Sequence, residues 1–299
     1  MQHTLSTHAV AACRVRIGLF DEWNKEHGVV LERLSLTNKK AVVTGGGTGL
    51  GRAMSLALAR AGADVALAGR RLEPLQETAA EIKQIGRQSL TVPTDITVPD
   101  QVTHLIQSVI EQWGHIDILI NNAGIVRGQE MKPVWEITDE EWHRGIDTNL
   151  SGAFYGVRAV ARHMAERQQG KIINVASGFA YRGRRHEYMY TSAKAAVVNL
   201  TRSLALSLVD YNIQVNCIVP GFFIVQPPDS PVGRQRREQQ GRFLAVGRTG
   251  EPEEIGPLAV FLSSSASNHM TGQAVISDGG GLSAGLGPLS VAPIAHAES

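Results

Sequence analysis

The feature that most constrains the fold is a regular alternation of short β-branched runs with helical patterns along nearly the whole chain. Most of these runs are apolar at consecutive positions, as is typical of strands that helices cover on both faces. A repeated strand-helix order predicts a single α/β domain with a doubly wound parallel sheet of about seven strands. The predicted strands are 41–44, 64–68, 89–92, 117–121, 171–176, 213–218 and 273–277, and the predicted helices are 50–61, 72–85, 100–113, 139–167, 190–209 and 252–264.

The composition excludes several classes of protein. The net charge of the 299 residues is +1, which argues against a broad surface for nucleic acid. No apolar run reaches the roughly 20 residues that a membrane-spanning helix needs. The two cysteines, Cys13 and Cys217, form neither a disulfide framework nor a metal-ligand spacing, and no HExxH pattern occurs. We therefore expect a cytoplasmic protein that binds neither nucleic acid nor membrane and holds no metal.

The two ends differ from the alternating region. Residues 1–35 precede the first predicted strand, and the first 20 of them contain no acidic residue, which loosely resembles a transit peptide. An N-terminal extension is the favoured interpretation. Residues 36–283 form the predicted domain, in which 222–246 is a substrate loop, and 284–299 are expected to be a flexible tail. The arginines Arg234, Arg236 and Arg237 in that loop fit an acidic substrate, although a solvated charged face is the favoured interpretation.

A glycine-rich turn follows the first predicted strand. The segment "TGGGTGLG" spans Thr44–Gly51, with glycines at 45, 49 and 51. Such glycines permit a tight turn and let the backbone at a helix N-terminus approach a pyrophosphate. The spacing is that of neither the commoner Gly-x-Gly-x-x-Gly fingerprint nor a P-loop. Because a strand precedes it and a helix follows, the segment predicts dinucleotide binding.

The residue after the second predicted strand indicates which dinucleotide binds. An acid at this position binds the ribose 2′-hydroxyl of NAD, whereas "GRR" places Arg70 there. A guanidinium suits a 2′-phosphate, so NADP(H) is favoured and NAD(H) stays possible. Asp95, at the end of the third predicted strand, is a candidate for the adenine edge, and a helix-start cap is the alternative.

The segment "YMYTSAK" places Tyr190 and Lys194 four residues apart, on one face of a predicted helix, and turns Tyr188 away from them. A phenol beside an ammonium should ionise below its usual pKa of about 10 and can then exchange protons near neutral pH. On its own the pair is weak evidence, since tyrosine and lysine at this spacing are usually surface residues.

Several further segments follow the glycine turn in order: "NNAG" at 121–124, Asn149 in "DTNLSG", Ser177 thirteen residues before Tyr190, "YTSAK" and Pro220-Gly221. Together with the glycine turn, they make the chain resemble the short-chain dehydrogenase/reductase family from about residue 36 to residue 283. Within it the chain resembles 3-oxoacyl-carrier-protein reductases and gluconate-type dehydrogenases. The resemblance implies a Rossmann-type fold, a homo-oligomer (dimer or tetramer), and hydride transfer between NAD(P)(H) and a small carbonyl or alcohol.

The resemblance also implies the roles of individual residues. Tyr190 is the acid/base, Lys194 lowers the pKa of Tyr190 and binds the nicotinamide ribose, Ser177 donates to the substrate oxygen, and Asn149 holds a proton-carrying water. The implied cofactor-binding residues are Gly45, Thr48, Gly49, Leu50, Gly51, Arg70, Asp95, Ile96, Asn122, Tyr190 and Lys194. The alternative is a non-catalytic NAD(P)-binding regulatory or structural subunit, which the presence of Ser177, Tyr190 and Lys194 disfavours.

Two departures from the family pattern bear on the substrate. Val225 stands where the family often has a threonine that contacts the nicotinamide amide. The segment between Ser177 and Tyr190 is basic and aromatic, so Arg184, Arg185 and His186, together with Arg127, are candidates for binding a carboxylate or phosphate. For each of these four, a surface or subunit contact is the favoured interpretation.

Overall fold

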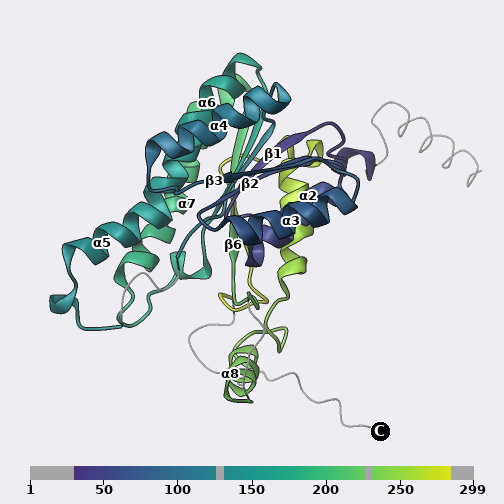
Figure 1. The fold of residues 1–299 in the computed structure, drawn as a ribbon. Coiled ribbons are helices and arrows are strands. Elements are labelled where there is room, and N and C mark those ends of the chain that lie inside the picture. Colours follow the sequence, from purple (N-terminus) through teal and green to yellow (C-terminus); the bar gives the residue numbers. More distant parts are fainter. Residues whose placement is uncertain (1–29, 126–130, 226–230, 284–299) are drawn as a thin grey trace, which may run out of the picture.

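The computed structural model describes residues 30–125, 131–225 and 231–283 (Figure 1). Predictions about Cys13, Arg127, residues 1–29 of the N-terminal extension, positions 226–230 of the predicted substrate loop and the C-terminal tail therefore lie outside the described residues, as does the side chain of Arg236.

Seven parallel strands form one sheet in the order β3-β2-β1-β4-β5-β6-β7, which confirms the predicted doubly wound architecture. The order reverses between β1 and β4, the place where ligands bind in such sheets. The strands are β1 Lys40–Thr44, β2 Asp64–Gly69, β3 Ser89–Pro93, β4 Ile118–Asn121, β5 Gly170–Val175, β6 Ile213–Pro220 and β7 Ala274–Ser277.

Helices cover both faces of the sheet (Figure 1). The α-helices are α2 Gly49–Arg60, α3 Leu72–Gln84, α4 Pro99–Trp113, α5 Asp139–Ile146, α6 Gly152–Glu166, α7 Tyr188–Leu208, α8 Pro231–Gly241 and α9 Gly256–Ser263. Short 3₁₀ turns lie at η1 Glu32–Leu34, η2 Val134–Glu136, η4 Gly178–Ala180, η5 Val209–Tyr211, η6 Pro252–Ile255 and η7 Ser265–Ser267.

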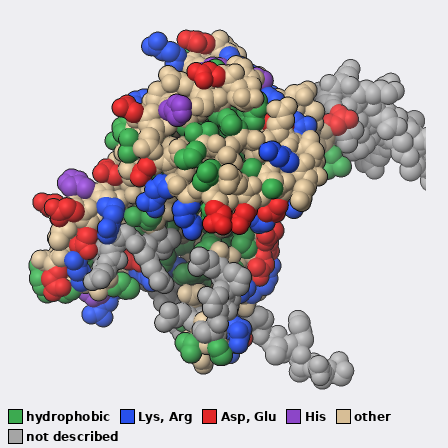
Figure 2. Space-filling view, in the orientation of Figure 1, with side chains coloured by type: hydrophobic (Ala, Val, Ile, Leu, Met, Phe, Trp, Pro, Cys, Tyr) green, Lys and Arg blue, Asp and Glu red, His purple; other side chains and the backbone are tan. Residues whose placement is uncertain are grey.

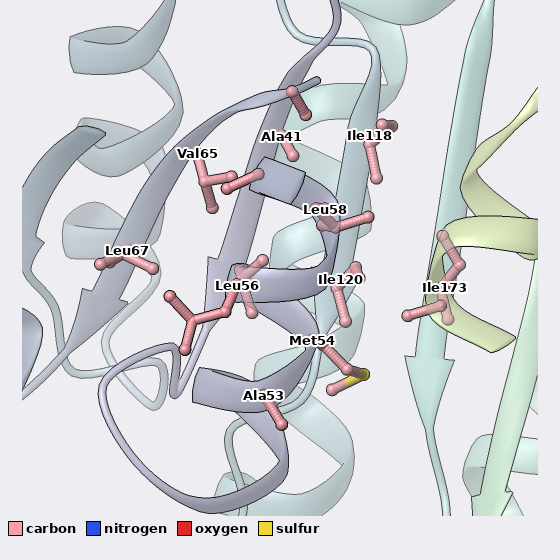
Figure 3. Close-up of a cluster of buried hydrophobic side chains, with 14 of the residues drawn as sticks. Ala41, Ala53, Met54, Leu56, Leu58, Val65, Leu67, Ile118, Ile120 and Ile173 are labelled. Atoms are coloured by element: carbon pink, nitrogen blue, oxygen red, sulfur yellow. The ribbon is translucent and has the colours of Figure 1, made fainter. Parts of the chain in front are cut away.

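The side-chain alternation of the strands divides the core into two layers. Ala41 and Val43 of β1 pack with α2, α3 and α9, whereas Val42 packs with α4, α6 and α7 on the other face. Figure 3 shows the first layer, where Met54 and Leu58 of α2 lie near the strand residues. The side chains of Met54 and Leu58 are fully buried. This apolar stripe of α2 fixes the position of the helix N-terminus at the edge of β1.

The predicted helix at 139–167 is wrong in one respect, because the chain forms α5, then the π-helical segment η3 Asp147–Ser151, and then α6. The side chain of Asn149, in η3, donates to the carbonyl oxygen of Gly145 over 3.0 Å and takes part in bonds with Ile125 outside the helix. π-helical turns are rare and often accompany functional sites. The sequence does not reveal the break, since residues 147–151 include neither glycine nor proline.

Candidate active site

The glycine turn after β1 is closely packed. Gly45 has a φ of +67°, which favours glycine. A Cβ on Gly51 would lie 2.1 Å from the Gly45 carbonyl oxygen and 2.4 Å from Asn122 Nδ2, so no larger residue fits. Thr48 precedes α2 without capping it through its side chain, and the first turn carries no acid. The N-terminus of α2 is thus suited to an anion such as a dinucleotide pyrophosphate.

The other predicted residues of this loop lie around the same helix start. Gly49, with a φ of +54°, and Leu50 begin α2. The side chain of Val225 lies beside them, since a Cβ on Gly49 would be 3.3 Å from a Val225 methyl carbon. The residue that replaces the family's threonine therefore contacts the glycine turn through an apolar side chain.

Asn122 ties β4 to β1. Its Nδ2 donates to the Thr44 carbonyl oxygen over 2.9 Å, and its backbone N–H and that of Ala123 donate to Thr44 Oγ1. Beneath it, Asn121 Nδ2 donates to Asn174 Oδ1 of β5 over 3.0 Å. These bonds hold the ends of the three central strands in register beside the glycine turn.

The ends of β2 and β3 carry the predicted adenosine residues. Arg70 is exposed and makes no hydrogen bond or ion pair with the described residues, so its guanidinium is available to a ligand. The carboxylate of Asp95 accepts from the backbone and hydroxyl of Thr97 at 2.9 and 2.7 Å. Burial acts to raise the pKa of Asp95, but the bonds from Thr97 and the charge of Arg70 outweigh it and lower that pKa.

Asp95 is not the cap of the following helix, since α4 starts after Val98 and takes no side-chain cap. Its neighbour Ile96 is buried against α6, where a Cβ on Gly152 would be 2.6 Å from Ile96 Cδ1. Ile96 therefore connects the β3 end of the site to the helix that follows the π-helical segment.

The candidate catalytic residues meet where β5 ends and α7 begins. Ser177 follows β5, and its hydroxyl acts on the Tyr190 phenol, whose pKa it lowers. Lys194, one turn further along α7, has its Nζ 5.8 Å from the centroid of the Tyr190 ring and donates to the Val175 carbonyl oxygen over 2.9 Å. Tyr188 is turned away, with its hydroxyl 3.4 Å from His186 Nδ1.

Burial dominates the electrostatics of this group. It raises the pKa of Tyr190, against a lowering by the Ser177 hydrogen bond, while Glu187 raises it further and Arg184 lowers it. Burial also lowers the pKa of Lys194 to about 8. The sequence-based expectation of a lowered Tyr190 pKa is thus wrong for this arrangement, because the buried Lys194 is directed at the Val175 carbonyl.

Asn149 reaches the same place from the π-helical segment. Its Oδ1 accepts from the Ile125 backbone over 3.1 Å, and its Nδ2 donates to the Ile125 carbonyl oxygen over 3.0 Å. A Cβ on Gly124 would lie 2.8 Å from Asn149 Oδ1 and 3.4 Å from Lys194 Nζ, so these three residues are close neighbours. The π-helical turn therefore brings the amide to the buried lysine.

An aromatic and charged wall lies beside Tyr190, in a segment that the sequence analysis marked as basic and aromatic without singling out Phe179, Arg182 or Glu187. The Phe179 ring meets those of Tyr190 and Phe222 edge to face, with centroids 6.3 and 6.1 Å apart. The Arg182 guanidinium lies over Phe179 at 5.0 Å, and Glu187 is buried at the start of α7. The available signal was their location between Ser177 and Tyr190 or just after Pro220-Gly221.

The arginines selected from the sequence have other partners. Arg184 pairs with Glu187 at 2.8 Å, and the Arg185 Nε lies 3.1 Å from His186 Nε2. Arg237 pairs with the exposed Glu251 at 3.3 Å, while Arg234 lines a hollow of about 310 Å³ between α8 and residues 247–251. This hollow lies apart from Ser177 and Tyr190, which do not line it, so it is not the predicted reaction centre.

Other site types find little support in the described residues. Basic, acidic and apolar side chains are interspersed on the face in Figure 2. Among the described residues, no group of histidine, cysteine and acidic side chains is arranged to hold a metal ion. None of the described helices is long and apolar enough to cross a membrane.

A family model described as short chain dehydrogenase matches residues 39–229, and the chain therefore belongs to the short-chain dehydrogenase family of oxidoreductases. Over 257 residues it is 35% identical to the 2-dehydro-3-deoxy-D-gluconate 5-dehydrogenase of Escherichia coli, covering 85% of this chain and 99% of that one. It is 34% identical to the 3-oxoacyl-[acyl-carrier-protein] reductase of Chlamydia pneumoniae, with coverages of 83% and 98%.

A solved structure is similar over a comparable length. The crystal structure of an NADPH-dependent 3-quinuclidinone reductase from Rhodotorula rubra aligns with a TM-score of 0.76 at 32% identity and covers 85% of this chain and 95% of the other. The named relatives are dehydrogenases and reductases, which agrees with the enzyme class predicted from the sequence.

Proposed function

We propose that this chain interconverts a ketone and a secondary alcohol by hydride transfer with a nicotinamide dinucleotide, that Tyr190 is the acid/base, and that NADPH is the preferred cofactor. The observation that carries the proposal is the meeting of Ser177, the Tyr190 phenol and the buried Lys194, whose Nζ lies 5.8 Å from the centroid of the Tyr190 ring. Tyr190 and Lys194 share α7, whereas Ser177 follows β5, so bringing Ser177 to the pair requires the fold and not sequence spacing alone.

The cofactor fits the residues at the switch point of the sheet. The uncapped N-terminus of α2 would receive the pyrophosphate, and the tight packing at Gly51 holds that helix start against the glycine turn. Arg70 would bind the 2′-phosphate, with Asp95 and Ile96 at the adenine side and Asn122 along the cofactor. The bound cofactor supplies or accepts the hydride.

The residues of the chain manage the proton and the developing charge. In the reductive direction the Tyr190 phenol donates its proton to the ketone oxygen, and the Ser177 hydroxyl donates a hydrogen bond to the same atom. A raised pKa of Tyr190 keeps the phenol protonated before the reaction. Lys194 would hold a ribose hydroxyl of the bound cofactor, and its charge there would favour the phenolate, while the neighbouring Asn149 would hold a proton-carrying water.

The remaining parts of the proposal rest on the family. Residues 36–283 are the proposed dinucleotide-binding and catalytic domain, in a cytoplasmic homo-oligomer that acts on a small molecule. The named relatives act on a sugar acid, an acyl group on a carrier protein and 3-quinuclidinone, and the first two provide substrate classes for a screen.

Parallel fluorescence titrations with NADPH and NADH test the cofactor assignment. We expect NADPH to bind about 10- to 100-fold more tightly, because a guanidinium-phosphate pair is a charge-assisted bidentate contact. In Arg70→Ala the preference should vanish while NADH binding is retained. Arg71→Ala, one residue further and equally exposed, is the matched control and should keep the preference. Tighter NADH binding by the wild type would contradict the assignment to NADP(H).

A further inference from the structure

Glu187 has a buried carboxylate oxygen without a hydrogen-bond donor. Its side chain is 6% exposed, and Oε1 accepts from Arg184 at 2.8 Å, whereas Oε2 is buried and has no partner. Roughly 90% of buried polar groups in proteins have a hydrogen-bond partner, so an unpaired carboxylate oxygen needs an explanation. A donor from a ligand is one.

The position of Glu187 places that oxygen next to the reaction centre. Glu187 is the residue before α7, and its partner Arg184 lies 5.5 Å over the Phe179 ring, which in turn meets Tyr190 edge to face. The charges of Glu187 and Arg184 both act on the Tyr190 phenol. The carboxylate therefore belongs to the same group of side chains as the phenol of the proposed reaction.

The other unpartnered buried atoms in the described residues do not combine these properties. Asn121 Oδ1 faces α6, where a Cβ on Gly156 would be 2.4 Å away, and Arg87 belongs to an ion pair with Asp64. Ser263 is in α9, on the opposite layer. Arg182 Nε belongs to a guanidinium stacked over Phe179 and Phe222, so the rings restrict access to it.

The wall around Glu187 favours a small polar ligand. Phe179 is half-buried and meets Tyr190 edge to face, so an apolar surface borders the phenol. Arg184 lies over the same ring at 5.5 Å while holding Oε1 of Glu187. A substrate would thus place carbon against Phe179 and a hydrogen-bond donor at Glu187.

We propose that Glu187 is a specificity-determining residue whose free Oε2 accepts a hydrogen bond from a substrate hydroxyl close to the reacting carbon, so that the enzyme selects hydroxy ketones and diols over ketones and alcohols without that hydroxyl. The inference rests on the proposed function, because it takes Tyr190 as the place of reaction. Arg184 holds the Glu187 carboxylate in one orientation through its hydrogen bond to Oε1.

The test compares ketones that differ by one hydroxyl group. We expect the wild type to reduce 3-hydroxy-2-butanone with a kcat/KM about 10- to 100-fold above that for 2-butanone, the range for one hydrogen bond to a charged group. In Glu187→Leu this ratio should fall to near one, mainly through the hydroxy ketone. Glu77→Leu, the same substitution at an exposed position of α3, is the matched control and should keep the ratio.

A merely structural role of Glu187 gives a different result. If Glu187 acts only on the fold or on Tyr190, Glu187→Leu lowers kcat/KM for both ketones equally and the ratio persists, which overturns the proposal. Arg184→Gln keeps the carboxylate but removes the group that orients it, so the preference for the hydroxy ketone should weaken by less than in Glu187→Leu. A loss of preference in Arg184→Gln as large as that in Glu187→Leu would assign selection to the ion pair and contradict the part given to Oε2.

Binding separates this proposal from the proposed function. Saturation-transfer NMR with 2,3-butanediol and 2-butanol on the cofactor-loaded protein requires no turnover. We expect a diol signal that exceeds the alcohol signal in the wild type and loses its excess in Glu187→Leu. If neither ketone is reduced with NADPH or NADH, the proposed function fails for these ketones. Equal ratios of the diol signal to the alcohol signal in wild type and Glu187→Leu would overturn the role proposed for Glu187.

Discussion

At the scale of single residues, Lys194 is held in surroundings that oppose its own charge. It is almost fully buried, and its ammonium has the Val175 carbonyl oxygen as partner at 2.9 Å. Burial lowers its pKa from 10.5 to about 8. In the proposed function Lys194 would serve the chemistry at the expense of stability, a common relation at active sites.

Lys194→Met should therefore stabilise the fold while removing activity. Below about pH 8 the lysine is charged in both the folded and the unfolded chain, so its full penalty is present. Between about pH 8 and 10.5 the unfolded chain binds more protons than the folded one, so wild-type stability rises with pH. After subtraction of the lost hydrogen bond, we expect a gain of about 1–2 kcal/mol at pH 7.

Thermal unfolding of wild type and Lys194→Met at pH 7 and pH 10 measures this gain. The difference in Tm should be largest at pH 7 and should shrink at pH 10, where the folded wild type has lost most of the charge. A difference in Tm that grows with pH would contradict the assignment of the penalty to the buried ammonium.

Tyr190→Phe removes one oxygen atom from the candidate site. The ring still meets Phe179 edge to face, so we expect the fold and NADPH binding to persist. Loss of the acid/base should lower kcat by about 10²- to 10⁴-fold. Tyr188→Phe, two residues earlier, is the control and should keep kcat within about threefold, since its hydroxyl faces His186. Equal losses in the two variants would mean that the wrong tyrosine had been assigned.

At the scale of elements, the start of α2 depends on Gly51. An added Cβ would lie 2.1 Å from the Gly45 carbonyl oxygen, so the helix would have to move away from β1. We expect Gly51→Ala to cost about 3 kcal/mol and to weaken NADPH binding by tenfold or more. Gly183→Ala is the control, because nothing lies within 4 Å of the added carbon. Unchanged Tm and cofactor Kd in Gly51→Ala would contradict this account of the turn.

The sequence predicted elements better than contacts. Each of the seven strands was predicted because buried parallel strands are apolar on both faces. The segment TGGGTGLG marked the first turn because the close packing there leaves no room for side chains larger than glycine. The π-helical break at Asn149 stayed hidden because residues 147–151 include neither glycine nor proline to mark it. Arg184 was a candidate for a ligand, with a surface or subunit contact favoured. Its partner is Glu187, three residues away, and only the fold shows that the pair lies at the Phe179 ring beside Tyr190.

At the scale of the whole molecule, the layer formed by α6, α7 and η5 leaves apolar side chains in solvent. Leu206 is 78% exposed, and Val209 and Phe154 are exposed as well. Leu206 and Val209 are three residues apart at the end of α7 and in η5, and an exposed apolar pair of this kind fits the expected homo-oligomer. The opposite layer, with α2, α3 and α9, carries the proposed cofactor side of the site at the start of α2.

Leu206→Lys should therefore shift the protein to a smaller species. A lysine ammonium buried at an apolar contact loses its hydration without gaining a partner, so it weakens association while the folded chain tolerates it on the surface. Sedimentation velocity at about 10 μM should show the wild type as a dimer or tetramer and the variant in a lower state. Leu72→Lys, at an exposed leucine of α3, is the control and should sediment like the wild type. If the wild type is an oligomer and Leu206→Lys sediments in the same way, the subunits meet at another surface. A monomeric wild type would contradict the expected homo-oligomer.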